Sequence, residues 1–186
     1  MKKKSIFADA RALEDAFFTK ENARLLEQLK EKQKREALRE VVQIKDEIFL
    51  DRLIELGIGP ETVLALTLVP LIAVAWADGT LDGRERDAII KAAEEKGVSP
   101  ETAGHQLLET WLSRRPEREL FDSWKQYVRG IWETFTDEER QRMRERTLDW
   151  ALAVAEASGG FLGVISKVSP SERVVIKELE NVLRVP

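Results

Sequence analysis

Three carboxylates lie close together in the stretch AWADGTLDGRE, which begins at Ala75. They are Asp78, Asp82 and Glu85, and they fall in a short turn between two apolar helical runs. Carboxylate and carbonyl oxygens are the ligands that calcium and magnesium prefer in proteins. The spacing therefore predicts a weak site for a divalent cation, calcium or magnesium, at these three residues. The sequence indicates no other cofactor.

The same residues also fit a purely structural role. Asp82 and Glu85 are three residues apart at the start of an expected helix. This is the spacing of a capping box, in which each side chain accepts a hydrogen bond from the other residue's backbone N–H. An EF-hand loop counted from Asp78 would have Gly83 correctly at its sixth position, but Ile89 where the twelfth requires a glutamate. The turn is therefore not an EF-hand, and a capped helix start explains most of it without a metal.

The composition excludes several kinds of chemistry. The 186 residues include no cysteine, which rules out disulfides, thiolate metal sites and cysteine nucleophiles. His105 is the single histidine, which argues against histidine catalysis and multi-histidine metal sites. The net charge is −4 with both signs interspersed, unlike the concentrated basic face of a nucleic-acid-binding protein. We therefore expect no catalytic residues, no enzyme activity and no nucleic-acid partner.

Helix signals are dense along the chain and strand signals are nearly absent, so the sequence predicts an all-α fold. Gly57 and Gly97 follow apolar periodic runs, as glycines at helix ends do. We expect a compact bundle of about six to seven helices. Three capping boxes mark expected helix starts, at Asp82 and Glu85, at Thr136 and Glu139, and at Ser169 and Glu172.

Residues 63–77 are apolar on nearly every side. A helix of this kind belongs at the centre of a bundle, and this one is too short to cross a bilayer. Pro70 lacks a backbone donor and clashes with the preceding turn, and we expect a kink there rather than a break near Val69. The start of the chain, MKKKSIFADA, lacks the long apolar core of a signal peptide. We therefore expect a cytoplasmic protein with at most a peripheral membrane contact.

The amino-terminal part differs from the rest. Apolar residues recur at helical spacing over residues 38–56, which predicts one amphipathic helix docked on the bundle. Residues 30–37, KEKQKREA, offer almost nothing to bury. We predict a helical arm over residues 1–36 and a helical domain over residues 37–186. The expected contact residues for a protein partner or a second copy are Leu13, Phe17, Phe18, Leu25 and Leu29 on the arm, with Phe161 and Leu162 in a glycine-rich loop. Packing of the arm on its own bundle is the alternative.

Two stretches of the chain follow the same pattern. AVAWADG leads to Asp82 and Glu85, and ALAVAEASGG leads to Ser169 and Glu172. Each is an alanine-rich helix that ends at glycine, followed by a linker, a capping box and an apolar helix. The sequence therefore predicts two degenerate helix-turn-helix repeats, in which Glu172 corresponds to Glu85.

Ala77-Asp78-Gly79, Leu81-Asp82 and Glu85, echoed in the second copy, resemble the TerB-like family of tellurite resistance over residues 60–184. The resemblance implies a helical fold with pseudo-symmetric halves and a bacterial stress-response role, with first-turn acidic residues suspected of metal binding. The function expected is a non-enzymatic adaptor or stress-response protein that binds a protein partner through its arm. The arm segment RALEDAFF also resembles the inhibitory segment of small ATP-synthase inhibitor proteins. The alternative function is thus a regulator or inhibitor of an ATPase, acting through the N-terminal helix.

Overall fold

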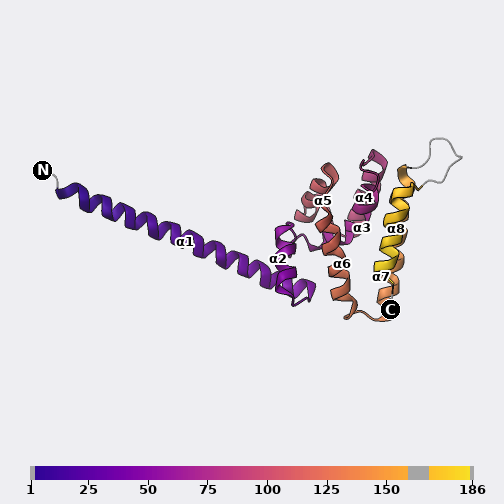
Figure 1. Cartoon of the computed structure of the whole chain (residues 1–186), viewed down its shortest axis with the longest axis horizontal. Coiled ribbons are helices and arrows are strands. Elements are labelled where there is room, and N and C mark those ends of the chain that lie inside the picture. The colour runs from indigo at the N-terminus through magenta and orange to yellow at the C-terminus, as the bar shows by residue number, and fades with distance from the viewer. Residues whose placement is uncertain (1–2, 159–167, 185–186) are drawn as a thin grey trace.

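The computed structural model describes residues 3–158 and 168–184, with side chains described over residues 19–157 and 168–184, and helices are the only regular secondary structure within these ranges. This confirms the predicted all-α bundle. Figure 1 shows one long helix projecting from a compact group of shorter ones. The helices are α1 (Lys3–Val42), α2 (Glu47–Glu55), the 3-10 helix η1 (Val63–Leu68), α3 (Val69–Ala75), α4 (Gly83–Glu95), α5 (Ala103–Ser113), α6 (Arg118–Trp132), α7 (Asp137–Ser158) and α8 (Pro170–Val182).

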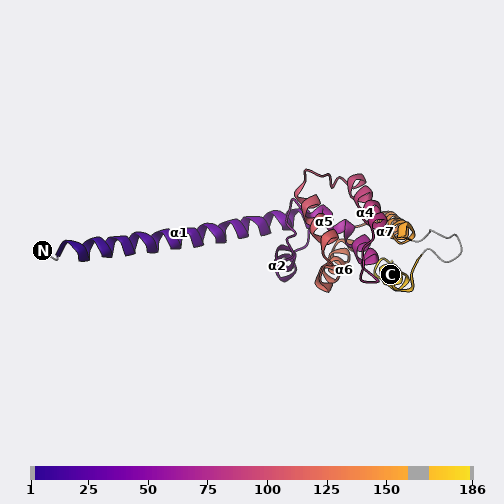
Figure 2. The ribbon, with the colours of Figure 1, turned by 90° about the horizontal axis from the view of Figure 1, so that it is seen from above.

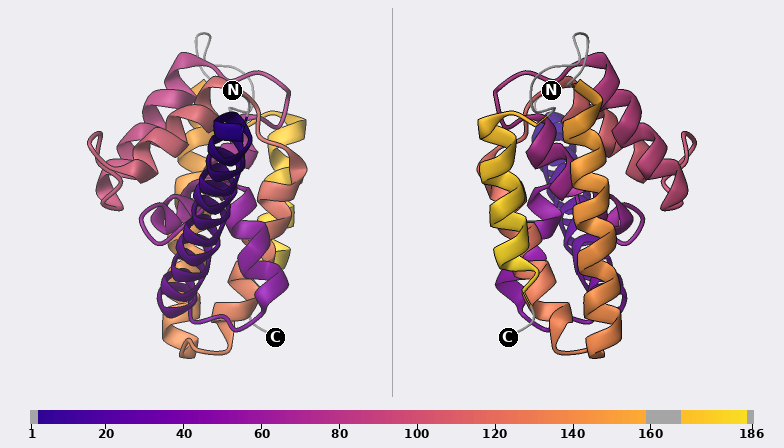
Figure 3. Two further views of the ribbon diagram at one scale, coloured as in Figure 1. Left: turned by 90° about the vertical axis from the view of Figure 1, so that its left-hand side faces the viewer. Right: turned by 90° about the vertical axis from the view of Figure 1, so that its right-hand side faces the viewer.

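The core surrounds α3, whose apolar residues contact several neighbours. Leu71 and Val74 of α3 are fully buried, as expected for a helix that is apolar on all sides. The helices α6, α7 and α8 pack directly against α3, and α4 packs along α7. Figure 3 shows α7 and α8 side by side on the face of the bundle opposite α1. The two helices that follow the repeated turns, α4 and α8, thus belong to one core.

Pro70 begins a helix instead of kinking one, which corrects the expected kink. Residues 63–68 form a 3-10 helix, and α3 starts at Val69 with the proline in its first turn. A proline costs little at this position, because the first N–H groups of a helix have no partner within it. The break near Val69 therefore removes the clash that a continuous helix would contain.

The expected single helix over residues 38–56 is also wrong, because the chain breaks inside it. Gln43 has a left-handed backbone with φ of 57°, which ends α1. Asp46 then caps α2, its carboxylate accepting a hydrogen bond from the backbone N–H of Phe49 at 3.2 Å. Leu38 and Val42 at the end of α1 are buried in the core, so α1 belongs to both the arm and the domain.

No helix among the described residues is long and apolar enough to cross a membrane. The longest, α1, has 40 residues and spans about 60 Å. Seen from above in Figure 2, it runs away from the bundle as a nearly straight rod. Its carboxyl end is held to α2 by Arg35, whose Nε lies 2.6 Å from Asp51 Oδ1, and by the Arg39–Glu47 ion pair.

Candidate functional site

The turn that contains Asp78 is closed by its own hydrogen bonds. Asp78 Oδ1 accepts from both the backbone N–H and the hydroxyl of Thr80, each at 2.9 Å. Gly79 has a φ of 95°, a conformation that glycine adopts at little cost. The negative charge of Asp78 after a helix end therefore has a local explanation, and Arg86 pairs elsewhere, with Glu109 of α5.

Asp82 and Glu85 form the predicted capping box. Asp82 Oδ1 accepts from the backbone N–H groups of Arg84 at 2.7 Å and Glu85 at 2.9 Å. Glu85 Oε2 accepts in return from the backbone N–H of Asp82 at 3.0 Å. The carboxylates that were expected to bind a cation are thus used to satisfy the first N–H groups of α4.

The side chains of this turn are not arranged as a metal centre in the structure. Among the described residues, no group of three or more histidine, cysteine, aspartate or glutamate side chains is arranged to hold a metal ion. The cation site at Asp78, Asp82 and Glu85 stays a prediction from the sequence. A terbium titration tests it, because emission sensitised by nearby Trp76 and displaced by calcium would establish the site, and no saturable emission would refute it.

The two capping glutamates meet inside the protein. Glu172 Oε2 accepts from the backbone N–H of Ser169 at the start of α8, repeating the arrangement of Glu85 on α4. Both glutamates are only 4% exposed, and their carboxyl groups are hydrogen-bonded to each other. The equivalent residues of the two repeats therefore form a buried acidic pair.

Burial is the main reason that the pKa of the Glu85 carboxyl rises from 4.5 to about 7. The backbone N–H of Asp82 opposes the rise, because it donates to the charged form of the carboxyl. The negative charges of Asp82 and Glu172, and the hydrogen bond to Glu172, raise the pKa further. Glu85 therefore titrates near neutral pH.

The pairing of Glu85 with Glu172 could not be predicted from the sequence. The two glutamates occupy equivalent positions in the repeats, and each capping box places its glutamate only at the start of its own helix. Spacing along the chain does not specify how two distant helix starts are placed relative to each other. Two capping boxes of matching spacing were the available signal.

The arm exposes leucines along a helix that the bundle does not cover. Leu25, Leu26 and Leu29 are 45%, 58% and 55% exposed. The first arm residues that line a cavity against the domain are Lys30, Gln33 and Lys34, which face the loop over residues 57–62. The three leucines therefore project beyond the contact between arm and domain, and the alternative in which this part of the arm packs on its own bundle does not describe this structure.

The positions of the other expected contact residues cannot be compared with the prediction, because their side chains lie outside the described residues. Leu13, Phe17 and Phe18 fall within α1, but their side chains lie outside the described residues. Phe161 and Leu162 lie outside the described residues altogether. Of the predicted docking residues, Leu25 and Leu29 are thus placed on an exposed face, and Leu26 joins them.

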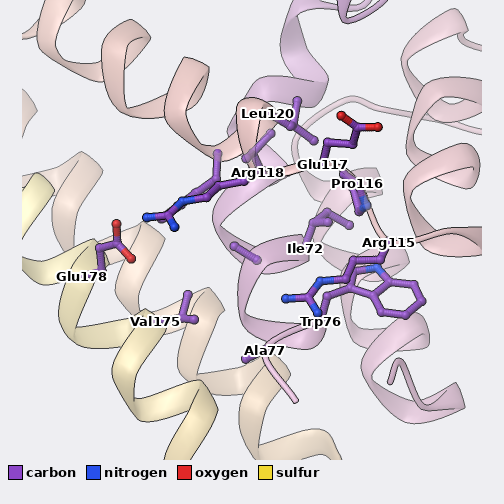
Figure 4. A pocket seen from close by; sticks show the side chains of 13 residues that line it. Ile72, Trp76, Ala77, Arg115, Pro116, Glu117, Arg118, Leu120, Val175 and Glu178 are labelled. Atoms are coloured by element: carbon purple, nitrogen blue, oxygen red, sulfur yellow. The ribbon is translucent and has the colours of Figure 1, made fainter. Parts of the chain in front are cut away.

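A cavity of about 500 Å³ lies between α3, the start of α6 and α8. Ile72, Trp76, Leu120 and Val175 contribute apolar walls, as Figure 4 shows. The charged residues at its edge are Arg115, Glu117, Arg118 and Glu178.

Its lining offers little for catalysis. It includes no serine, cysteine or histidine, and Glu178 already accepts from Lys125 Nζ at 3.1 Å. Trp76 is also committed, since its Nε1 donates to the Trp111 carbonyl at 2.9 Å. The cavity could accept an apolar group with an anionic end, but it contains no pair of groups placed for acid–base or nucleophilic chemistry.

Comparison with known proteins identifies no relatives, because no protein family model, no curated protein and no solved structure matches this chain.

Proposed function

We propose that this protein is a non-enzymatic helical adaptor of the TerB-like type, acting in the cytoplasm, which binds a protein partner through its N-terminal arm. The observation that carries the proposal is the exposure of Leu25, Leu26 and Leu29 on a helix that projects from a folded domain. Clustered apolar side chains on a helix face are typical of surfaces that dock in a groove or pair with another helix.

The composition of the arm supports a bound state. Local ion pairs add little to the stability of an isolated helix. The arm contains one such pair, in which Arg24 Nη2 lies 2.6 Å from Glu21 Oε1. Most helix stability in proteins comes from burying an apolar face. A partner that covers the leucines would supply this burial, and the domain would then hold the partner at a fixed distance.

The test compares two triple variants of the tagged full-length chain. The first replaces Leu25, Leu26 and Leu29 with glutamine. The second replaces the exposed polar residues Glu27, Lys30 and Glu31 with glutamine, so both variants carry the same new residue in the same turns. Partner retention during purification from the native cells, and the molar mass by light scattering, are then measured.

The leucine variant is expected to lose its partner or its self-association by at least tenfold in amount, while the polar variant keeps it. Equal behaviour of the two variants would refute docking through the leucines. A mass of twice the chain, lost only in the leucine variant, would identify the partner as a second copy.

A further inference from the structure

Another cavity, of about 510 Å³, lies between η1, the end of α4, α6 and α7. It shares no lining residue with the cavity beside α3. Much of its wall is apolar and aromatic, formed by Trp124, Tyr127, Ile131, Phe135 and Met143. Cavities of this size hold small molecules in other proteins. This one is therefore large enough for an aromatic ring system or a short acyl chain.

Two cations meet at this cavity without an acidic partner. Lys96 follows the last turn of α4, Arg146 belongs to α7, and both line the cavity. Neither side chain forms an ion pair or a hydrogen bond within the part of the chain that the structure describes. Burial lowers the pKa of the Lys96 ammonium from its usual value, and the positive charge of Arg146 lowers it further. Arg142 adds a third positive charge to the lining, although it also acts on Glu139.

The fold by itself accounts for only one of the two unpaired cations. A positive charge is favoured at the carboxyl end of a helix, which suits Lys96. Arg146 has no such reason, because it lies far from both ends of α7. Of the acidic residues that line the cavity, Glu95 is exposed, and Glu139 accepts from the backbone N–H and the hydroxyl of Thr136 at 2.8 and 2.9 Å. The repulsion between Lys96 and Arg146 is therefore not offset by an ion pair.

Two hydroxyl groups of the lining also lack partners. Thr147 is only 8% exposed, and its hydroxyl forms no hydrogen bond with any residue that the structure describes. The same holds for the half-buried Tyr127, whose pKa is raised by burial, so its phenol keeps its proton at neutral pH and can donate. A buried hydroxyl without a partner costs free energy, which a bound acceptor recovers. Cations and hydroxyl donors are thus available together beside an apolar wall.

We propose that this cavity binds a phosphate monoester with an aromatic or acyl body, its phosphate between Lys96 and Arg146 and its body against Trp124 and Phe135. A phosphate monoester carries more than one negative charge near neutral pH and has several acceptor oxygens, so it suits two cations better than a carboxylate does. Soluble esters and lipid headgroups both supply this chemistry, and the experiments separate the two sources. The proposal is independent of the arm.

The first experiment uses the wild-type chain. Its two methionines are Met1 and Met143, and Met143 lines the cavity. With carbon-13 in both methyl groups, titration with 1-naphthyl phosphate or octyl phosphate should shift the Met143 signal to saturation and leave the Met1 signal in place. Inorganic phosphate and 1-naphthylmethylammonium should bind at least about tenfold more weakly, because the first lacks the body and the second has the opposite charge. The absence of a saturable Met143 shift with either ester, or equal binding of the ammonium compound, would overturn the proposal.

The second experiment compares two double variants that lose the same charge from the same two helices. Lys96→Gln/Arg146→Gln removes the cations of the cavity, and Lys91→Gln/Arg144→Gln removes two cations that do not line it. The first variant should bind 1-naphthyl phosphate at least about tenfold more weakly, while the second stays within about twofold of the wild type. Urea unfolding without ligand confirms that both variants fold. Equal affinities of the two variants would mean that these cations do not form a site, and the wild-type titration decides if the first variant does not fold.

Flotation with phosphatidylcholine vesicles identifies the source of the phosphate. Half of the samples contain phosphatidic acid, a lipid whose headgroup is a phosphate monoester. Flotation that requires this lipid, is lost in Lys96→Gln/Arg146→Gln and persists in Lys91→Gln/Arg144→Gln would assign the cavity to a lipid headgroup. Saturable binding of the soluble esters without flotation would assign it to a soluble ligand. If the chain binds neither the vesicles nor the esters, the proposal is wrong.

Discussion

At the scale of single residues, Asp82 and Ser169 perform the same task with different chemistry. Each side chain accepts from the backbone N–H of the glutamate three residues later, Asp82 at 2.9 Å and Ser169 at 3.2 Å. A charged carboxylate is therefore not required to start such a helix. What the two positions share is a short side chain with an oxygen acceptor.

This equivalence predicts how Asp82 tolerates substitution. Asp82→Ala should lower the free energy of unfolding by about 1 kcal/mol, because the first N–H groups of α4 lose their acceptor. Asp82→Ser should keep most of that stability, since serine supplies the oxygen that Ser169 supplies on α8. Urea unfolding at fixed pH measures both variants. Equal losses for alanine and serine would mean that the charge of Asp82, and not its capping oxygen, stabilises the turn.

At the scale of secondary-structure elements, the connection between α1 and α2 is packed tightly against α6. A β-carbon at Gly130 of α6 would lie 2.5 Å from Ile44 Cδ1 and 2.9 Å from Ile44 Cγ1. Gly130 is therefore needed for a close approach and not for backbone freedom. This approach fixes where α1 leaves the domain.

Gly130→Ala should consequently lower the free energy of unfolding by about 1 kcal/mol, because the overpacking outweighs the better helix propensity of alanine. In an Ile44→Ala background the clash disappears, and the same change should stabilise the protein by up to about 1 kcal/mol. Thermal or urea unfolding of the four proteins gives the coupling between the two sites. A stabilising effect of Gly130→Ala in both backgrounds would show that Ile44 does not press on this helix.

At the scale of the whole molecule, we expect the domain to stay folded when the arm is removed up to residue 36. Removing residues 1–36 leaves Leu38 and Val42, which are buried in the core, and takes away chiefly exposed side chains. The free energy of unfolding should change by less than about 1 kcal/mol, since the main loss among the described contacts is a surface ion pair of Arg35.

Removing residues 1–42 is the matched control and should cost about 3 kcal/mol or more, because two core side chains are lost. Urea unfolding of the two truncated chains makes the comparison. Equal stability of the two would place the end of α1 outside the core, and a large loss on removing residues 1–36 would mean that the arm helps to hold the domain together.

Local patterns in the sequence predicted the helices and their capped starts well, because capping and periodicity act within a few residues. The same patterns failed at Gln43, because a polar residue with no turn signature adopts a left-handed backbone there. They also failed at Pro70, where the sequence allowed either a kink or a helix start and the structure has a helix start. The Glu85–Glu172 contact escaped prediction for a related reason. It depends on how two distant helix starts are placed in space, which spacing along the chain does not specify.

Site-specific photo-crosslinking tests most directly whether the arm docks a protein through Leu25, Leu26 and Leu29. A photoreactive phenylalanine derivative would replace Leu26 in one strain and Glu31, an exposed polar residue one to two turns further along, in another. After irradiation of intact cells, we expect a discrete crosslinked product from position 26 and little from position 31. The absence of a product at position 26, or equal products at both positions, would contradict docking through this face.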